Sequence, residues 1–124
     1  MLESLFYQHV GDWEHFVIDF KENEPHEVKL YGHGRPKKYK WGHKDLNFRA
    51  NRPIIYAARG SHAMYPKPGH FTTMHVPTIF GKDLVDETSR GPLWDTMKNL
   101  VISPYRDYGE YDGHFWWMNF QGKS

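Results

Sequence analysis

Residues 13–20 read Trp-Glu-His-Phe-Val-Ile-Asp-Phe, and large apolar side chains stand at every second position from 16 to 20. In a β-strand this spacing places those side chains on one face, because successive residues point to opposite sides. A polar stretch, residues 21–25, follows, and residues 26–31 have the composition of a second strand. The two strands are therefore expected to pair as a hairpin.

The rest of the chain consists of short apolar runs separated by glycine, proline and asparagine, with no window of sustained helical periodicity. We expect, in chain order, a lysine-rich edge strand at 37–41, a buried strand at 54–58, a loop at 60–70, one helical turn within 92–99, and short strands at 100–103 and 114–120. These elements predict a mainly β fold, an antiparallel β-sandwich with long loops and little helix. A chain of 124 residues fits a single domain, residues 1–124.

The composition excludes several classes of protein. The net charge is +1 with nine neutral histidines, so the basic excess typical of nucleic-acid binders is missing. The chain has no cysteine, which excludes disulfides, thiolate chemistry and cysteine-based zinc sites. No apolar run is long enough to span a membrane, and residues 1–10 lack the basic start of a signal peptide. The expected location is the cytoplasm or the periphery of a membrane, with secretion left open.

The segment 9–15 carries the first candidate site. Asp12 and Glu14 would point to the same face of a strand, and His9 lies shortly before them. Two carboxylates and an imidazole suit a divalent cation, with Mg²⁺ or Ca²⁺ expected first and Zn²⁺ or Mn²⁺ as alternatives. The other interpretation is a strand start with solvated carboxylates.

The second candidate site is the segment 59–66, directly after the expected buried strand, where loops often carry function. His62 is a candidate metal ligand, general base or hydrogen-bond anchor, and Arg59 is a candidate for holding an anion. Further candidates are His70 as an alternative base, and Ser61 and Tyr65 as ligand contacts. The competing interpretation of His62 is a histidine that ties down the loop.

Acidic residues gather in the segment 82–95, where Asp86 is a candidate for completing the metal site. The alternative is a turn in which Asp86 accepts backbone hydrogen bonds. Trp94 and Trp117 are candidate stacking surfaces for a ligand, although aromatic clusters more often belong to a core.

Three blocks, residues 9–15, 53–70 and 86–95, and the closing Trp-Met-Asn-Phe-Gln-Gly at 117–122 resemble the vacuolar protein sorting-associated protein 62 family in order and approximate spacing. This resemblance implies a role in protein traffic to the vacuole and no established chemistry. Members of the family usually have more sequence upstream of the first block, whereas eight residues precede His9 here. The chain is therefore expected to be an N-terminally short member, a fragment or one part of a larger assembly.

The pattern formed by His9, Asp12, Trp13 and Glu14 is also similar, more distantly, to a block of the necrosis- and ethylene-inducing peptide-like toxins. In those toxins the block's first histidine, its aspartate and its glutamate bind a divalent cation on a β-sandwich and help to engage sphingolipid head groups. The resemblance implies that His9, Asp12 and Glu14 are cation ligands here. It does not imply toxin activity, because residues 10 and 11 depart from the toxin block.

These observations leave three functions open. The first is a binding module, in which a divalent cation helps to hold a glycan, a lipid head group or another small ligand. The second is a metal- or histidine-dependent enzyme, a hydrolase, lyase or cyclase with its site around His62. The third is a structural role, in which the polar blocks lock loops through buried hydrogen bonds. We rank binding first and catalysis second, and we expect a homodimer if a sheet edge is left exposed.

Overall fold

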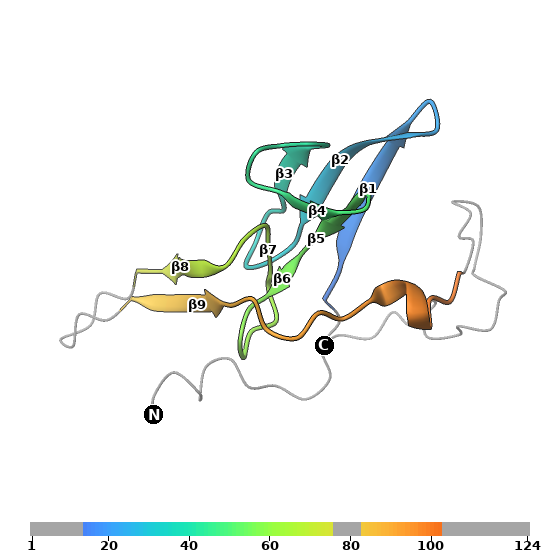
Figure 1. Cartoon of the computed structure of the whole chain (residues 1–124). Helices are drawn as coiled ribbons and strands as arrows, with labels where there is room; N and C mark the ends of the chain where they lie inside the picture. Colours follow the sequence, from blue (N-terminus) through green and yellow to red (C-terminus); the bar gives the residue numbers. More distant parts are fainter. Residues whose placement is uncertain (1–13, 76–82, 103–124) are drawn as a thin grey trace, which may run out of the picture. The chain divides into compact units, whose positions relative to one another are not determined.

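The computed structural model describes residues 14–75 and 83–102. The chain forms two compact units, Met1–Gly91 and Pro92–Ser124, and each is described by itself. The described residues are mainly β, in four small antiparallel sheets with a single short helical turn (Figure 1), which confirms the predicted fold class. The interpretation of the chain as one domain remains a prediction.

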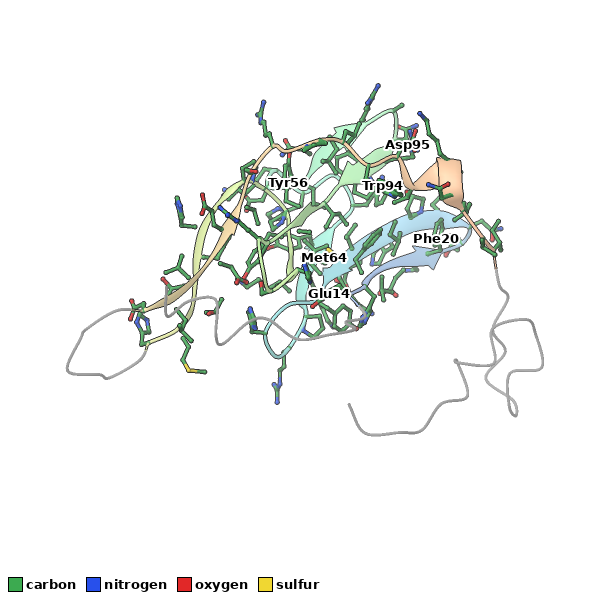
Figure 2. All side chains as sticks on the ribbon, turned by 90° about the horizontal axis from the view of Figure 1, so that it is seen from below. Glu14, Phe20, Tyr56, Met64, Trp94 and Asp95 are labelled. Carbon is green, nitrogen blue, oxygen red and sulfur yellow. The ribbon has the colours of Figure 1, made fainter. Side chains whose placement is uncertain are left out.

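The largest of these sheets has three strands in the order β1, β2, β3. Strand β1 (Phe16–Lys21) pairs with β2 (Glu24–Leu30), and β2 pairs with β3 (Lys37–Lys40), in both cases antiparallel. The predicted hairpin and the predicted lysine-rich edge strand are thus confirmed. Figure 2 shows Phe20 towards the turn end of this hairpin, where the side chain is mostly exposed.

Two tight hairpin turns use left-handed backbone at residues other than glycine. Between β1 and β2, Glu22 and Asn23 have φ values of 53° and 65°. Between β4 (Asn47–Arg49) and β5 (Arg52–Ile54), Ala50 and Asn51 have φ values of 46° and 58°. Two-residue hairpin turns favour this conformation because its twist matches that of the flanking strands, but the Cβ of alanine opposes it.

Replacing Ala50 with glycine is expected to leave stability unchanged or raise it by up to about 1 kcal/mol, because relief of the left-handed strain offsets the greater freedom of the unfolded chain. Ala57 is an exposed alanine of a strand without a positive φ, so Ala57→Gly is the matched control. That control is expected to lose about 0.5–1 kcal/mol. Urea unfolding of both variants measures the difference, and equal losses would contradict the assignment of strain to Ala50.

The hydrophobic core of the first unit lies under β2. Val28, Leu30 and Leu46 are buried and form one cluster, and partly buried Ile18 and Tyr39 pack against it from the two neighbouring strands. A smaller cluster contains Ala58, Ala63 and Tyr65, with Phe71 packed against it. The alternation of β2 therefore places its apolar residues inward, as the strand period requires.

The predicted single strand at 54–58 is wrong. The chain leaves β5 at Ile54 and forms a separate strand, β6 (Tyr56–Ala57), because the two segments pair with different partners, β4 and β7 (Met64–Tyr65). Only the last residue of the predicted strand, Ala58, is buried. The predicted loop at 60–70 is also wrong in part, since it contains β7 and the start of β8 (Gly69–Met74), which pairs with β9 (Leu84–Thr88).

The described residues of the second unit, 92–102, contain one short 3-10 turn, η1 (Thr96–Asn99), which confirms the helical turn predicted within 92–99. It begins after Asp95, whose Oδ1 accepts a hydrogen bond from Met97 N at 3.1 Å. Residues 100–102 lie in no strand, so the strand predicted at 100–103 is wrong for them: among the described strands, none pairs with this apolar run. The strand predicted at 114–120 lies outside the described residues.

Candidate binding site

Asp86 is the most deeply buried charged side chain that the structure describes, with 2 % of its surface exposed. It lies in the middle of β9, where Leu84, Asp86 and Thr88 face inward and Val85 and Glu87 face solvent. The strand thus buries two polar side chains and exposes a valine. A buried carboxylate persists only where donors compensate its lost hydration, so its partners identify what this part of the fold is built around.

Three side chains from two other segments donate to Asp86. Ser61 Oγ lies 2.8 Å from Oδ1, Tyr65 Oη lies 2.7 Å from Oδ2, and His33 Nε2 lies 2.9 Å from Oδ2. We call His33, Ser61, Tyr65 and Asp86 the Asp86 cluster. An ionised carboxylate only accepts hydrogen bonds, so the proton of the His33 ring that faces it is on Nε2. These short, charge-assisted bonds join the loop after β2, the segment 61–65 and β9.

The loop between β6 and β7 turns Ser61 inward. Ala58 N donates to Ala63 O at 2.9 Å, and His62 N donates to Ala58 O at 3.1 Å, which closes the loop on itself. Gly60 and His62 take left-handed φ values of 91° and 59°. As a result Ser61 is buried and the neighbouring His62 is exposed. Local backbone geometry thus separates two residues that the sequence places side by side.

A cavity of about 150 Å³, partly open to solvent, adjoins the Asp86 cluster. The residues that line it include three that can carry positive charge or donate hydrogen bonds, His33, Arg35 and Lys37, and also Tyr65, Phe71 and Thr72. The rings of Tyr65 and Phe71 are stacked, with centroids 4.0 Å apart and planes 16° apart. The ammonium of Lys37 lies 6.0 Å from the Tyr65 ring centroid, at the limit of a cation–π contact. The cavity combines a stacked aromatic wall with a cationic rim.

The structure brings together three of the residues that the sequence named, Ser61, Tyr65 and Asp86. The three candidate catalytic residues, Arg59, His62 and His70, are all exposed, and none of them is among the described residues that line this cavity. Arg59 N donates to Glu87 O at 2.9 Å, and His70 Nε2 lies 3.8 Å from Glu87 Oε1. Their catalytic roles therefore remain predictions.

The candidate metal ligands lie mostly beyond the described part of the chain. His9 and Asp12 are outside it, and Glu14, which is partly buried, is its first residue. Trp117, the candidate stacking residue, also lies outside the described residues. In residues 14–75 and 83–102 no three His, Asp or Glu side chains are grouped as they would be around a metal ion. Asp86 as a metal ligand stays a prediction, and the structure shows both its oxygens accepting bonds from protein donors.

Trp94 belongs to the second unit and is 73 % exposed. Figure 2 shows it beside Asp95, the residue that caps the 3-10 turn. An exposed indole is compatible with the predicted stacking role, which remains a prediction.

His33 is the member of the Asp86 cluster that the sequence did not reveal. It stands between two glycines in what reads as an ordinary turn. The available signal was the histidine itself, because a titratable ring between two glycines next to a buried strand is well placed to reach a neighbouring element. Nothing in its local sequence points to a carboxylate 53 residues away.

Comparison with known families settles the relationship of the chain. The family model described as vacuolar protein sorting-associated protein 62 matches residues 4–108. The chain belongs to this family. The matched range includes the block at 9–15, the Asp86 cluster and the residues that line the cavity.

Two curated relatives, both from Saccharomyces cerevisiae, belong with it. Vacuolar protein sorting-associated protein 62 is 36 % identical over 103 residues, which cover 73 % of this chain and 22 % of the relative. Putative vacuolar protein sorting-associated protein TDA6 is 31 % identical over 138 residues, which cover 92 % of this chain and 29 % of the relative. The chain thus matches less than a third of either family member. No solved structure gives a significant match.

A search of the described residues for membrane-spanning helices finds none of sufficient length and apolar character. This agrees with the hydropathy of the sequence and leaves the location of the protein as a prediction.

Proposed function

We propose that this member of the vacuolar protein sorting-associated protein 62 family is a binding module for the polar head group of a lipid or a glycan, acting in protein sorting at the periphery of a membrane. The observation that carries the proposal is the cavity beside the Asp86 cluster. It offers an aromatic wall and cations to one small polar ligand.

The size of the cavity favours a head group over a larger molecule. Pockets for drug-sized ligands measure about 300–1,000 Å³, and this one measures about 150 Å³. Its walls are held by hydrogen bonds between distant segments, including Met64 N to Tyr31 O at 2.8 Å, so the cavity is preformed in the fold. A preformed site loses little free energy to ordering when a ligand binds.

The names of the two curated relatives support a role in vacuolar protein sorting. Since the chain spans only 22 % and 29 % of their lengths, the binding module would be one part of such a protein. The sorting role of the whole protein is therefore part of the proposal.

A divalent cation is the second part of the proposal, with His9, Asp12 and Glu14 as ligands. It is supported by the spacing of these residues and by the resemblance of the block to cation-binding toxins. Carboxylate oxygens with one imidazole suit Mg²⁺ or Ca²⁺ bound at a surface. The ion would coordinate hydroxyl or phosphate oxygens of the ligand directly.

The test is flotation of the purified protein with phosphatidylcholine vesicles containing phosphatidylinositol, alongside a glycan panel, with Ca²⁺ or Mg²⁺ or with excess chelator. Chelator is expected to weaken binding, and added Ca²⁺ or Mg²⁺ to restore it. Asp12→Asn is expected to weaken cation-dependent binding by about tenfold or more, since even outer-shell partners of a metal contribute that much.

Glu24→Gln, an exposed carboxylate of β2, is the matched control and should leave binding unchanged. Binding that is insensitive to chelator would contradict the role of the cation. Failure to bind any of the vesicles or glycans would contradict the binding module itself.

The described geometry does not favour the enzymatic alternative. A hydrolase, lyase or cyclase centred on His62 would need that ring, or His70, to face an enclosed ligand, since a general base acts within hydrogen-bond reach of the proton it removes. Both rings are exposed. We therefore keep binding as the proposed function.

A further inference from the structure

Four cations stand close together in one segment of a chain whose net charge is only +1. The chain has 16 Lys and Arg against 15 Asp and Glu. The segment 35–40 holds four of these cations, Arg35, Lys37, Lys38 and Lys40, and no acidic residue. Two of the four, Arg35 and Lys37, are among the residues that line the cavity.

Strand pairing decides which of these lysines face the cavity. Lys37 is opposite Leu30 and Lys38 is opposite Lys29, so the two adjacent lysines point to opposite faces of the sheet. Leu30 is buried. Both Leu30 and Lys37 are among the residues that line the cavity. Lys38 has the same charge one residue away and faces the other side of the sheet.

The cavity wall therefore carries the side chains of Lys37, Arg35 and His33. No acidic side chain is among the described residues that line it. Asp86, the carboxylate of the cluster, is not among these lining residues, and its oxygens already accept three hydrogen bonds. His33 both lines the cavity and is bonded to Asp86.

We propose that this cavity binds a phosphate group, in the form of a phosphate monoester. Arg35 provides a planar guanidinium suited to two parallel bonds with phosphate oxygens, and Lys37 provides a point charge. The cavity of about 150 Å³ is large enough to admit one phosphate group. This inference rests on the proposed function and names the chemical class of its head group.

The decisive measurement is titration of the full chain with inorganic phosphate, followed by NMR amide shifts and calorimetry. Saturable shifts are expected at residues 32–37 and at Thr72. Lys37→Gln and Arg35→Gln are each expected to weaken phosphate binding by about tenfold or more, since a hydrogen bond to a charged group contributes about that factor. Lys38→Gln removes the same charge from the same strand and should change the affinity less than about twofold, because exposed charges contribute little.

Two further arms identify the source of the phosphate. One uses glycerol 3-phosphate in solution, and the other uses phosphatidylcholine vesicles carrying phosphatidic acid, with phosphatidylserine vesicles of equal total charge as the comparison. If the protein binds phosphatidic acid vesicles more tightly than phosphatidylserine vesicles, and Lys37→Gln weakens that binding, the phosphate belongs to a lipid head group. Binding of glycerol 3-phosphate alone, with the same loss, assigns a soluble ester.

Equal losses in Lys37→Gln and Lys38→Gln, or equal binding of the two anionic vesicles without binding of free phosphate, would overturn the inference and leave only attraction between surface charges. Glycan or neutral-lipid binding that survives in Lys37→Gln would overturn the inference alone and leave the proposed binding module in place. All the substituted side chains are exposed, so unchanged thermal unfolding serves as the check that each variant is folded.

Discussion

Replacing Asp86 with alanine is expected to destabilise the first unit by about 3–5 kcal/mol, the largest effect of any single substitution described here. The change leaves the hydroxyls of Ser61 and Tyr65, both buried, without their acceptor, and it frees His33 from the loop after β2. Each buried donor that loses its partner costs about 1–3 kcal/mol. Urea unfolding followed by circular dichroism measures the loss.

Glu87→Ala is the matched control for that measurement. Glu87 is the next residue of β9, and 58 % of its side chain is exposed. Its removal is expected to change stability by less than about 0.5 kcal/mol. A loss below about 1 kcal/mol in Asp86→Ala would show that the cluster does not lock the fold. Asp86 would then be better explained as a carboxylate kept for a ligand, as in its predicted metal role.

Replacing Leu30 with alanine is the second large effect, with an expected loss of about 2–5 kcal/mol. Leu30 is 2 % exposed and packs in the cluster with Val28 and Leu46. It also lines the cavity, so its truncation removes buried contacts and widens the proposed ligand site at the same time. The affinity for phosphate is expected to fall with stability, because the wall that presents Lys37 loses its support.

Leu100→Ala gives the same chemical change at a residue of the second unit that is 51 % exposed. It is expected to cost about 1 kcal/mol or less, since only part of that side chain leaves water on folding. Thermal unfolding of the two variants measures the difference. Similar losses at the two positions would contradict the assignment of the main core to the region under β2.

The part of the fold that could be predicted from the sequence is the part whose contacts are local. The alternation at 16–20 and the polar turn at 21–25 specify the β1–β2 hairpin, because its partners are adjacent in the chain. The lysines of β3 likewise indicate an edge strand. The single strand predicted at 54–58 was wrong because an apolar run does not indicate which strands it pairs with. Strands β5 and β6 pair with different partners, β4 and β7.

The residues of the candidate site also differ in how far the sequence could predict them. Ser61 and Tyr65 could be named because they follow an apolar run, where functional loops often begin. Their shared acceptor, Asp86, could not be assigned its place, because β9 buries its polar residues and exposes Val85, against the usual pattern. Only pairing with β8 and contact with the segment 61–65 explain that inversion.

The bond from His33 to Asp86 closes a loop of 53 residues, whereas the β1–β2 hairpin joins residues that are close in the chain. Closing a long loop is entropically unfavourable until several contacts form together. We therefore expect the β1–β2 hairpin to form early in folding and the His33–Asp86 bond to form late. An interaction made after the folding barrier acts mainly on how long the folded state lasts, and refolding and unfolding rates of the Asp86→Ala protein would show whether this holds. If the Asp86→Ala protein refolds at an unchanged rate and unfolds faster, the cavity is completed after the folding barrier, and a half-folded chain would lack the proposed phosphate site.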